Sequence, residues 1–333
     1  SISDFIAALP KAELHVHIEG TMEPELLFSL ATRNSVSLPY TLEESQEKRQ
    51  NFADLQDFLN QYYDACKVLV TESDFYDLAM AYFRRAISNN IKHTEIFFDP
   101  QTHRSRSISF ETFMLGFQRA TAEAEMLGLS VKWILCILRD LTEENAIEII
   151  NEASQYKHII AGIGLDSAEI GNPPSKFKKA FREASRLGLC GENGNNIVAH
   201  AGEEGDPSYV LEALIFLKAK RIDHGVRSLE DPYLCKFLEN SRIPLTVCPN
   251  SNNRLQVNTR YFAGRNVVKE LLDKKVVATI NSDDPAFFGG YLNDNYKTVA
   301  DSFQHLSTNE VKEILALLAK NGFEASFISQ ELK

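Results

Sequence analysis

Eight short apolar runs recur along this chain of 333 residues, and they constrain its fold more than any other feature of the sequence. Most of the runs are continuously apolar rather than alternating, which is typical of strands that are buried on both faces. Helix-like segments separate them, so we expect parallel strands joined by crossover helices. The runs span residues 13–20, 93–100, 131–140, 159–167, 196–205, 221–228, 244–252 and 276–285.

Eight such units predict an α/β fold of the (β/α)8 TIM barrel type. The alternative is an open, doubly wound sheet, but Ser167 stands where a G-x-G-x-x-G phosphate motif needs its third glycine. The long connection 21–92 contains a further helical segment at 52–69, and 309–322 is a predicted closing helix. We therefore expect one domain over 1–333, with extra helices after the first strand and at the C-terminus.

Four of the intervening segments are helix-like, and three of them carry signals of a helix start. Ser109, Thr142 and Asp206 are of the types that cap helix N-termini, and Pro207 suits a first helical turn. We expect helices over 75–90, 109–128, 142–156 and 207–220.

The charge and the cysteines limit the classes of partner and compartment. The net charge is −11, with no long basic run, whereas nucleic-acid binding usually needs a basic surface. No apolar stretch approaches the ~18 residues of a membrane-spanning helix, so we expect no membrane partner. The five cysteines include no C-x-x-C pair and are expected to be free thiols of a cytoplasmic protein.

Ionisable side chains stand at the carboxyl ends of five of the eight runs. In a TIM barrel these ends meet at one rim, which is where the active sites of barrel enzymes lie. The residues concerned are His15, His17, Glu19, Asp166, Glu169, His200, Glu203, Glu204, Asp223, His224, Asp283 and Asp284.

Part of this rim has the chemistry of a metal site. His15 and His17 are two apart in a strand, so they point to the same face. With His200 and Asp283 they offer three imidazoles and a carboxylate, a set that suits zinc and leaves one position for water. A lone strand histidine is usually a core residue, and only the joint pattern favours a metal; the remaining histidines lack such partners, namely His93, His103, His158 and His305.

Other catalytic chemistries lack their motifs. A binuclear hydrolase of this shape would commonly use a modified lysine after the fourth run, and 159–170 contains no lysine, which favours a single metal. The cytidine-deaminase pattern H-x-E…P-C-x-x-C and the serine-hydrolase pattern G-x-S-x-G are both absent.

Four motifs resemble those of the adenosine/adenine deaminase family of the amidohydrolase superfamily. They occur in family order over nearly the whole chain, and the stretches EIFFDPQTHRSR and SDDPAFFGGYLNDNY are similar to adenine deaminases of the bacterial and fungal type. The four motifs are ELHVHIEG, AHAGEEG, DHGVRS and NSDDPAFFGG.

The resemblance implies hydrolysis of adenine to hypoxanthine and ammonia in purine salvage, with one Zn²⁺ per subunit held by the four ligands named above. It implies that Glu203 protonates ring N1, which requires a carboxyl group with a raised pKa. It further implies that His224 orients and helps to deprotonate the attacking water. Asp283 would serve both the metal and catalysis, and Asp284 would bond the ring near N7.

Three more acidic residues are predicted to contact the substrate, and two of them bear on its identity. Glu169 is predicted to crowd a ribose and to accept the N9–H of free adenine, a donor that nucleosides lack. Glu19 stands where adenosine enzymes often have a shorter aspartate. Asp166 is the third.

The sequence leaves several alternatives open. Asn250 and Asn253 place amides in the loop after the seventh run, where they could favour an N6-substituted adenine. Adenosine is a further alternative substrate, and a catalytically inactive metal-binding scaffold is the alternative outside enzymes. Glu203 and His224 argue against the scaffold because holding zinc does not require them. The expected partner is a small purine, and the sequence leaves open whether the chain forms a homo-oligomer. The insertion 191–196 is predicted to lie on the bottom face of the barrel.

Overall fold

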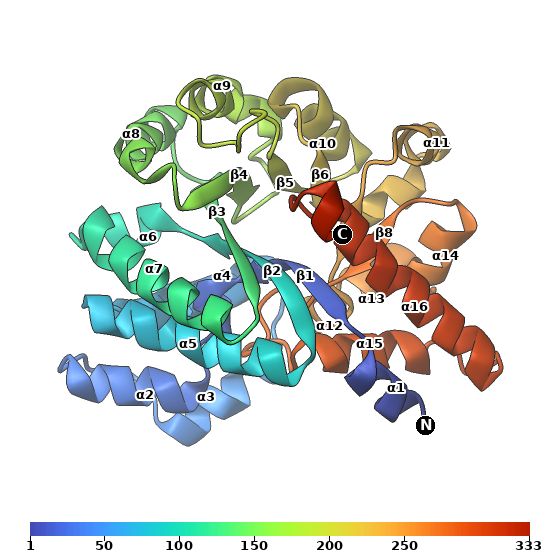
Figure 1. Ribbon diagram of the computed structural model, residues 1–333, viewed down its shortest axis with the longest axis horizontal. Coiled ribbons are helices and arrows are strands. Elements are labelled where there is room, and N and C mark those ends of the chain that lie inside the picture. Colours follow the sequence, from blue (N-terminus) through green and yellow to red (C-terminus); the bar gives the residue numbers. More distant parts are fainter.

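Eight parallel strands form the centre of the computed structural model, which describes residues 1–333 (Figure 1). Strands β1 to β4 pair in order, as do β5 to β8. Two parallel bridges, Ile163 to Ile197 and Val16 to Asp283, join these sheets on both sides and close the ring. The strands are β1 (Lys11–His17), β2 (Ile91–Phe98), β3 (Ser130–Leu138), β4 (Ile160–Asp166), β5 (Val198–Ala201), β6 (Arg221–His224), β7 (Leu245–Val247) and β8 (Ala278–Ile280).

Each predicted run overlaps one strand, so the TIM barrel is confirmed and the open sheet is wrong. The strands of the second half are much shorter than their runs, because the polar residues at the carboxyl ends turn into loops. β8 ends at Ile280, for example, although the run continues to residue 285.

Helices cover the outside of the ring, and the predicted cap residues begin them. The side chains of Ser109, Thr142 and Asp206 accept hydrogen bonds from backbone N–H groups of the first turns of their helices. The outer helices are α5 (Glu72–Ser88), α7 (Phe110–Met126), α8 (Glu143–Ala153), α9 (Lys178–Arg186), α10 (Pro207–Glu212), α11 (Pro232–Ser241), α14 (Val267–Asp273) and α15 (Leu292–Asp301). None of the helices in the structure is both long and apolar enough to cross a bilayer.

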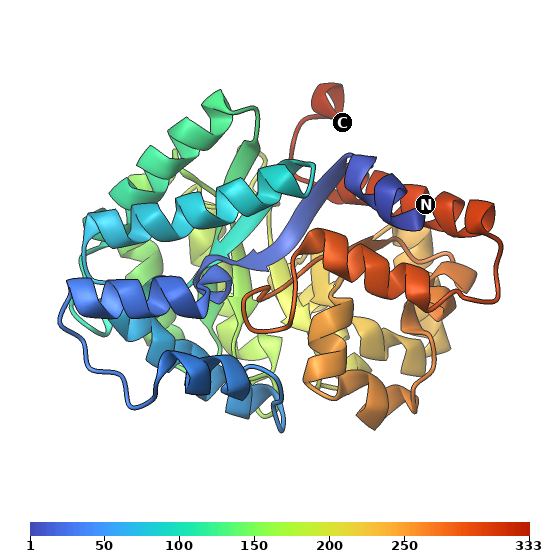
Figure 2. The same ribbon diagram turned by 90° about the horizontal axis from the view of Figure 1, so that it is seen from below.

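The extra helices lie at opposite ends of the barrel. After β1 the chain forms α2 (Pro24–Arg33), α3 (Leu42–Lys48) and α4 (Leu55–Ala65). The chain closes with α16 (Thr308–Ala325), which packs against β1 and β8. Figure 2 shows both termini on one side of the molecule and the blue segment of α3 and α4 on the other.

The amino-terminal end of the barrel is closed by residues that take no part in the rim described above. The Arg221 guanidinium is buried, donates to Glu95 Oε1 at 2.7 Å and stacks on the Phe327 ring at 4.3 Å. The insertion 191–196 precedes β5, and its Asn196 side chain donates to the Ala161 carbonyl at the start of β4 at 2.8 Å. The insertion therefore lies at the bottom of the barrel, as predicted.

Candidate active site

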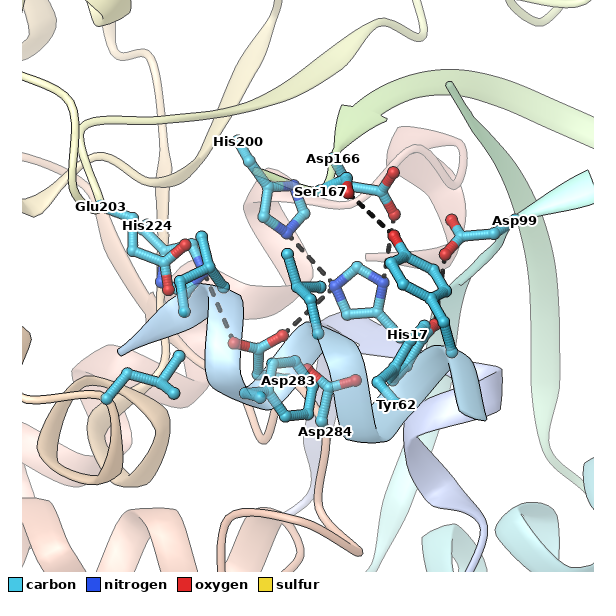
Figure 3. Close-up of a pocket in the computed structure, with 15 residues that line it drawn as sticks. His17, Tyr62, Asp99, Asp166, Ser167, His200, Glu203, His224, Asp283 and Asp284 are labelled. Atoms are coloured by element: carbon cyan, nitrogen blue, oxygen red, sulfur yellow. Dashed lines mark hydrogen bonds and ion pairs between the residues drawn. The ribbon is translucent and has the colours of Figure 1, made fainter. Parts of the chain in front are cut away.

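A cavity opens at the carboxyl ends of the strands, underneath α4. The side chains of Leu55, Phe58 and Leu59 from α4, together with Leu255, form its apolar cover. Its polar lining is shown in Figure 3 and consists of His17, Tyr62, Tyr63, Asp99, Asp166, Ser167, His200, Glu203, His224, Asp283 and Asp284.

The four predicted metal ligands converge at the floor of this cavity. Nε2 of His17 lies 3.2 Å from Nε2 of His200. Asp283 Oδ1 lies 3.1 Å from His15 Nε2 and 3.2 Å from His17 Nε2. All four ligand atoms fall within 4.8 Å of one another. Three imidazole nitrogens and one carboxylate oxygen facing a common point are the donor set of a zinc site, so the residues fit a metal ion.

The outer nitrogen of His15 is hydrogen-bonded in the way a metal requires, and that of His200 faces a carboxylate. Thr246 Oγ1 donates to Asp223 Oδ1 at 2.9 Å, so Thr246 accepts from His15 Nδ1, which is 2.9 Å away. Asp223 Oδ2 also lies 3.3 Å from His200 Nδ1. A proton held on Nδ1 leaves the Nε2 lone pair free for a metal. Burial, reinforced by the neighbouring His15, holds the pKa of His200 well below its usual value, which keeps this imidazole neutral.

Two of the clustered residues have left-handed backbone conformations. His224 and Asp283 both have φ of 63°, which is uncommon for residues other than glycine and is found where local strain serves a site. Asp283 is also paired with β1: it accepts from the His17 N–H at 2.9 Å and donates to the His15 carbonyl at 3.0 Å. Strand β8 ends at Ile280, and the left-handed turn at Asp283 separates the carboxylates of Asp283 and Asp284.

Gly20, the last residue of ELHVHIEG, makes room for Asp284. A Cβ atom at position 20 would lie 1.9 Å from Asp284 Oδ1. That oxygen is buried and has no hydrogen-bond partner in the protein. The glycine therefore allows Asp284 to turn into the cavity with an oxygen free for a ligand.

Glu203 and His224 stand together beside the cluster. Glu203 Oε2 lies 3.4 Å from His224 Nε2, and Asp283 Oδ2 lies 3.5 Å from the same nitrogen. Burial and the nearby charge of Asp283 raise the pKa of Glu203 well above its usual range, while burial lowers the pKa of His224 to about 4. The site thus pairs a carboxylic acid that retains its proton with a neutral imidazole, which is the arrangement needed for general acid–base catalysis.

Glu169 does not face the cavity, so its predicted contact with substrate is wrong. Its carboxylate accepts from four consecutive backbone N–H groups of the loop after β5, those of residues 202–205, at 2.7, 3.2, 2.8 and 2.8 Å. Gly205 approaches so closely that a Cβ there would lie 2.7 Å from Glu169 Oε2. Glu169 therefore fixes the loop that carries Glu203.

Loss of this acceptor should destabilise the fold. We expect Glu169→Gln to lower the free energy of unfolding by about 3 kcal/mol or more, because an amide nitrogen would replace an oxygen that accepts buried N–H groups. Urea denaturation followed by circular dichroism measures the change. The same substitution at the exposed Glu192 is the matched control and should change stability by less than about 0.5 kcal/mol. An equally stable Glu169→Gln would contradict this role.

Glu19 is likewise turned away from the cavity. Its carboxylate accepts from the Asp99 N–H at 2.8 Å and from Tyr62 Oη at 3.2 Å, and it lies 3.0 Å from His103 Nε2. The predicted direct contact of Glu19 with substrate is therefore wrong, and it positions Tyr62 and the start of the loop after β2 instead. His103, expected to have no such partner, is a buried member of this network.

Asn250 and Asn253 do not alter the cavity wall. Asn250 Oδ1 accepts from the Thr298 hydroxyl at 2.6 Å, and Asn253 Oδ1 accepts from the Asn258 amide at 2.6 Å. Neither side chain lines the cavity. These two asparagines therefore give no reason to expect an N6-substituted adenine as substrate.

Several cavity residues were missed by the sequence reasoning. Asp99 directly follows β2, so the rule that selected the other rim residues could have identified it. Tyr62 and Tyr63 come from α4, within the predicted helical segment 52–69, but nothing in the sequence indicated which side chains of that segment face the rim. Asp166, in contrast, lies where predicted, with Oδ2 3.5 Å from His17 Nδ1.

The chain matches known proteins along nearly its full length. The family model described as adenosine deaminase matches residues 10–333. An adenine deaminase from Wolinella succinogenes is 50% identical, covering 100% of this chain and 97% of that protein. The crystal structure of an adenine deaminase from Arthrobacter aurescens is 44% identical with a TM-score of 0.89, covering 98% of this chain and 96% of that one.

A more distant solved structure shows the same fold. It is an amidohydrolase from Burkholderia ambifaria with bound Zn, 23% identical with a TM-score of 0.87, and the match covers 99% of this chain and 89% of that one. Barrel, rim residues and full-length matches agree, and the chain is an enzyme that belongs to the adenosine deaminase family.

Proposed function

We propose that this enzyme hydrolyses adenine to hypoxanthine and ammonia, as part of purine salvage. The observation that carries the proposal is the pairing of Glu203 and His224 beside the clustered histidines, in a chain whose half-identical relatives are adenine deaminases. A metal-binding scaffold would need neither the raised pKa of Glu203 nor an unpartnered Asp284 oxygen in the cavity.

We propose Zn²⁺ as the cofactor, one per subunit, with His15, His17, His200 and Asp283 as its ligands. The support is the donor set itself and the bound Zn of the Burkholderia amidohydrolase. When bound, zinc acts as a Lewis acid that makes hydroxide available at neutral pH.

The protein groups divide the remaining work at the purine ring. Attack at C6 costs aromaticity, and Glu203 lowers that cost by donating its proton to N1, so that negative charge does not build up on the ring. His224 receives one proton of the attacking water, and its low pKa favours the neutral form that can accept one. His224 then gives that proton to the departing amine, which leaves as ammonia. The remaining hydroxyl proton returns to Glu203 as the C6 carbonyl forms. Asp284 bonds the N7 side and fixes the ring in the plane where C6 faces the cluster. General acid–base assistance of this kind is worth about 10²–10⁴-fold in rate.

We further propose a cytoplasmic location and no macromolecular partner beyond other copies of the chain. All five cysteines are free and buried, as suits a reducing compartment.

Steady-state kinetics on three substrates test the proposal. Zinc-loaded protein should convert adenine, with adenosine and N6-methyladenine as poor substrates, in an ultraviolet absorbance assay supported by ammonia release. Equal kcat/KM for adenine and adenosine would overturn the free-base assignment. Bound metal without deamination of any of the three would favour the scaffold.

A further inference from the structure

Two buried oxygens in the cavity wall have no hydrogen-bond partner in the protein. They are Oδ1 of Asp99, which follows β2, and Oδ1 of Asp166, which ends β4. The two residues are 1% and 3% exposed, and both line the cavity. Figure 3 shows them on the opposite side of His17 from Glu203. Because buried polar atoms are nearly always hydrogen-bonded, a bound molecule is expected to supply the donors.

The other polar groups of this wall are already satisfied by one another. The Tyr63 hydroxyl donates to Ser167 Oγ at 2.9 Å. The Tyr62 hydroxyl lies 3.3 Å from Asp99 Oδ2 and 3.2 Å from Glu19 Oε2. No lysine or arginine lines the cavity. The wall therefore offers carboxyl oxygens as hydrogen-bond acceptors and no cation, which suits an N–H group and leaves a phosphate without a partner.

The inference rests on the proposed function. With N1 at Glu203 and N7 at Asp284, the edge of the purine left to face the remaining polar wall bears N3 and N9. We propose that Asp99 and Asp166 form the subsite that accepts the N9–H of a free purine base and so select free bases over nucleosides and nucleotides. In a nucleoside, N9 carries a sugar in place of the hydrogen, so it has no donor to offer here. A nucleotide also places a phosphate near a wall of acidic residues.

The comparison of adenine with 9-methyladenine isolates this contact. The methylated base keeps N1, C6 and N7 but lacks the N9 hydrogen, and it adds far less bulk than ribose. The native enzyme should favour adenine by about 100-fold in kcat/KM, since a site built for a donor rejects an analogue without it. Asp99→Ala and Asp166→Ala should each reduce that preference by at least about 10-fold, because each removes an acceptor and opens space for the methyl group.

Two features of the design separate specificity from structural damage. Both substrates are measured on the same preparation, so metal lost through the contact of Asp166 with His17 cancels from the ratio. Tyr63→Phe is the matched control. It removes a hydroxyl group from the same wall, but that hydroxyl is bonded to Ser167 and not to the two aspartates. It should alter kcat/KM for the two substrates by the same factor and leave the preference unchanged.

The outcomes distinguish the subsite from the function. Absence of adenine turnover by the zinc-loaded native enzyme would refute the proposed function. Adenine turnover with an unchanged preference in both alanine variants would refute the subsite alone. If neither variant folds, a preference below about 3-fold in the native enzyme refutes it. Metal analysis gives a last check, since two ions per chain would mean that His17, Asp99 and Asp166, whose ligand atoms lie within 4.8 Å, hold a second cation instead.

Discussion

Glu203→Gln should lower kcat/KM for adenine by about 10²–10⁴-fold while the protein keeps its metal. The amide has nearly the same shape and can still hydrogen-bond N1, but it cannot transfer a proton to it. The measurement is the initial rate of adenine deamination, with metal content determined on the same samples. Glu204→Gln is the matched control: this neighbour pairs with Arg260 at 3.2 Å outside the cavity lining, and its substitution should change the rate only a few-fold.

The pH dependence of the same variant identifies the proton. Burial raises the pKa of Glu203, so its acid form is present below that pKa and is lost as the pH rises through it. Deamination by the native enzyme should therefore decline on the alkaline side as Glu203 ionises. The residual activity of Glu203→Gln should lack this alkaline decline, because an amide does not titrate. A native-like decline in the variant would assign the proton to another group.

His15→Ala should abolish adenine turnover and metal binding together. Losing an outer partner of a metal ligand typically costs about 10–100-fold, and losing one of four ligands should cost more. Elemental analysis and the shift of the melting temperature on adding a chelator are the measurements. Native protein should be destabilised by the chelator, because bound metal stabilises the folded state, and the variant should not respond.

The control for this variant is another histidine. His305 is exposed and is not one of the residues of the potential metal site, so His305→Ala should keep both metal and activity. A His15→Ala protein with a full metal complement would remove this residue from the ligand set.

The barrel and the clustered side chains could be predicted because they follow from local patterns. Each strand is a short apolar run, and the parallel topology forces the carboxyl ends of all runs to one rim. His15, His17, His200, Glu203, His224 and Asp283 were therefore found from their positions alone. Glu169 and Glu19 satisfy the same positional rule, yet their carboxylates bind backbone N–H groups and buried side chains. Whether an acidic side chain faces the cavity or hydrogen-bonds a loop depends on the path of the loops. Sequence periodicity does not determine that path.

The covering helix shows the same limit. The segment 52–69 is predicted to be helical, but which face meets the cavity depends on packing of Phe58 against Phe287 and Phe288, more than two hundred positions later. Tyr62 and Tyr63 could not be assigned to the wall without that contact.

The ligand set also determines when in the life of the chain the site can exist. His15 and Asp283 are 268 residues apart, and the backbone pairing that joins them is the one that closes the ring. During synthesis, His15, His17 and even His200 emerge long before the fourth ligand. A chain that folds as it is made therefore completes its metal-binding pocket only once nearly all of it has left the ribosome, after the strands on either side of the closure have formed. The pairing of β1 with Asp283 thus closes the barrel and completes the metal site in one step.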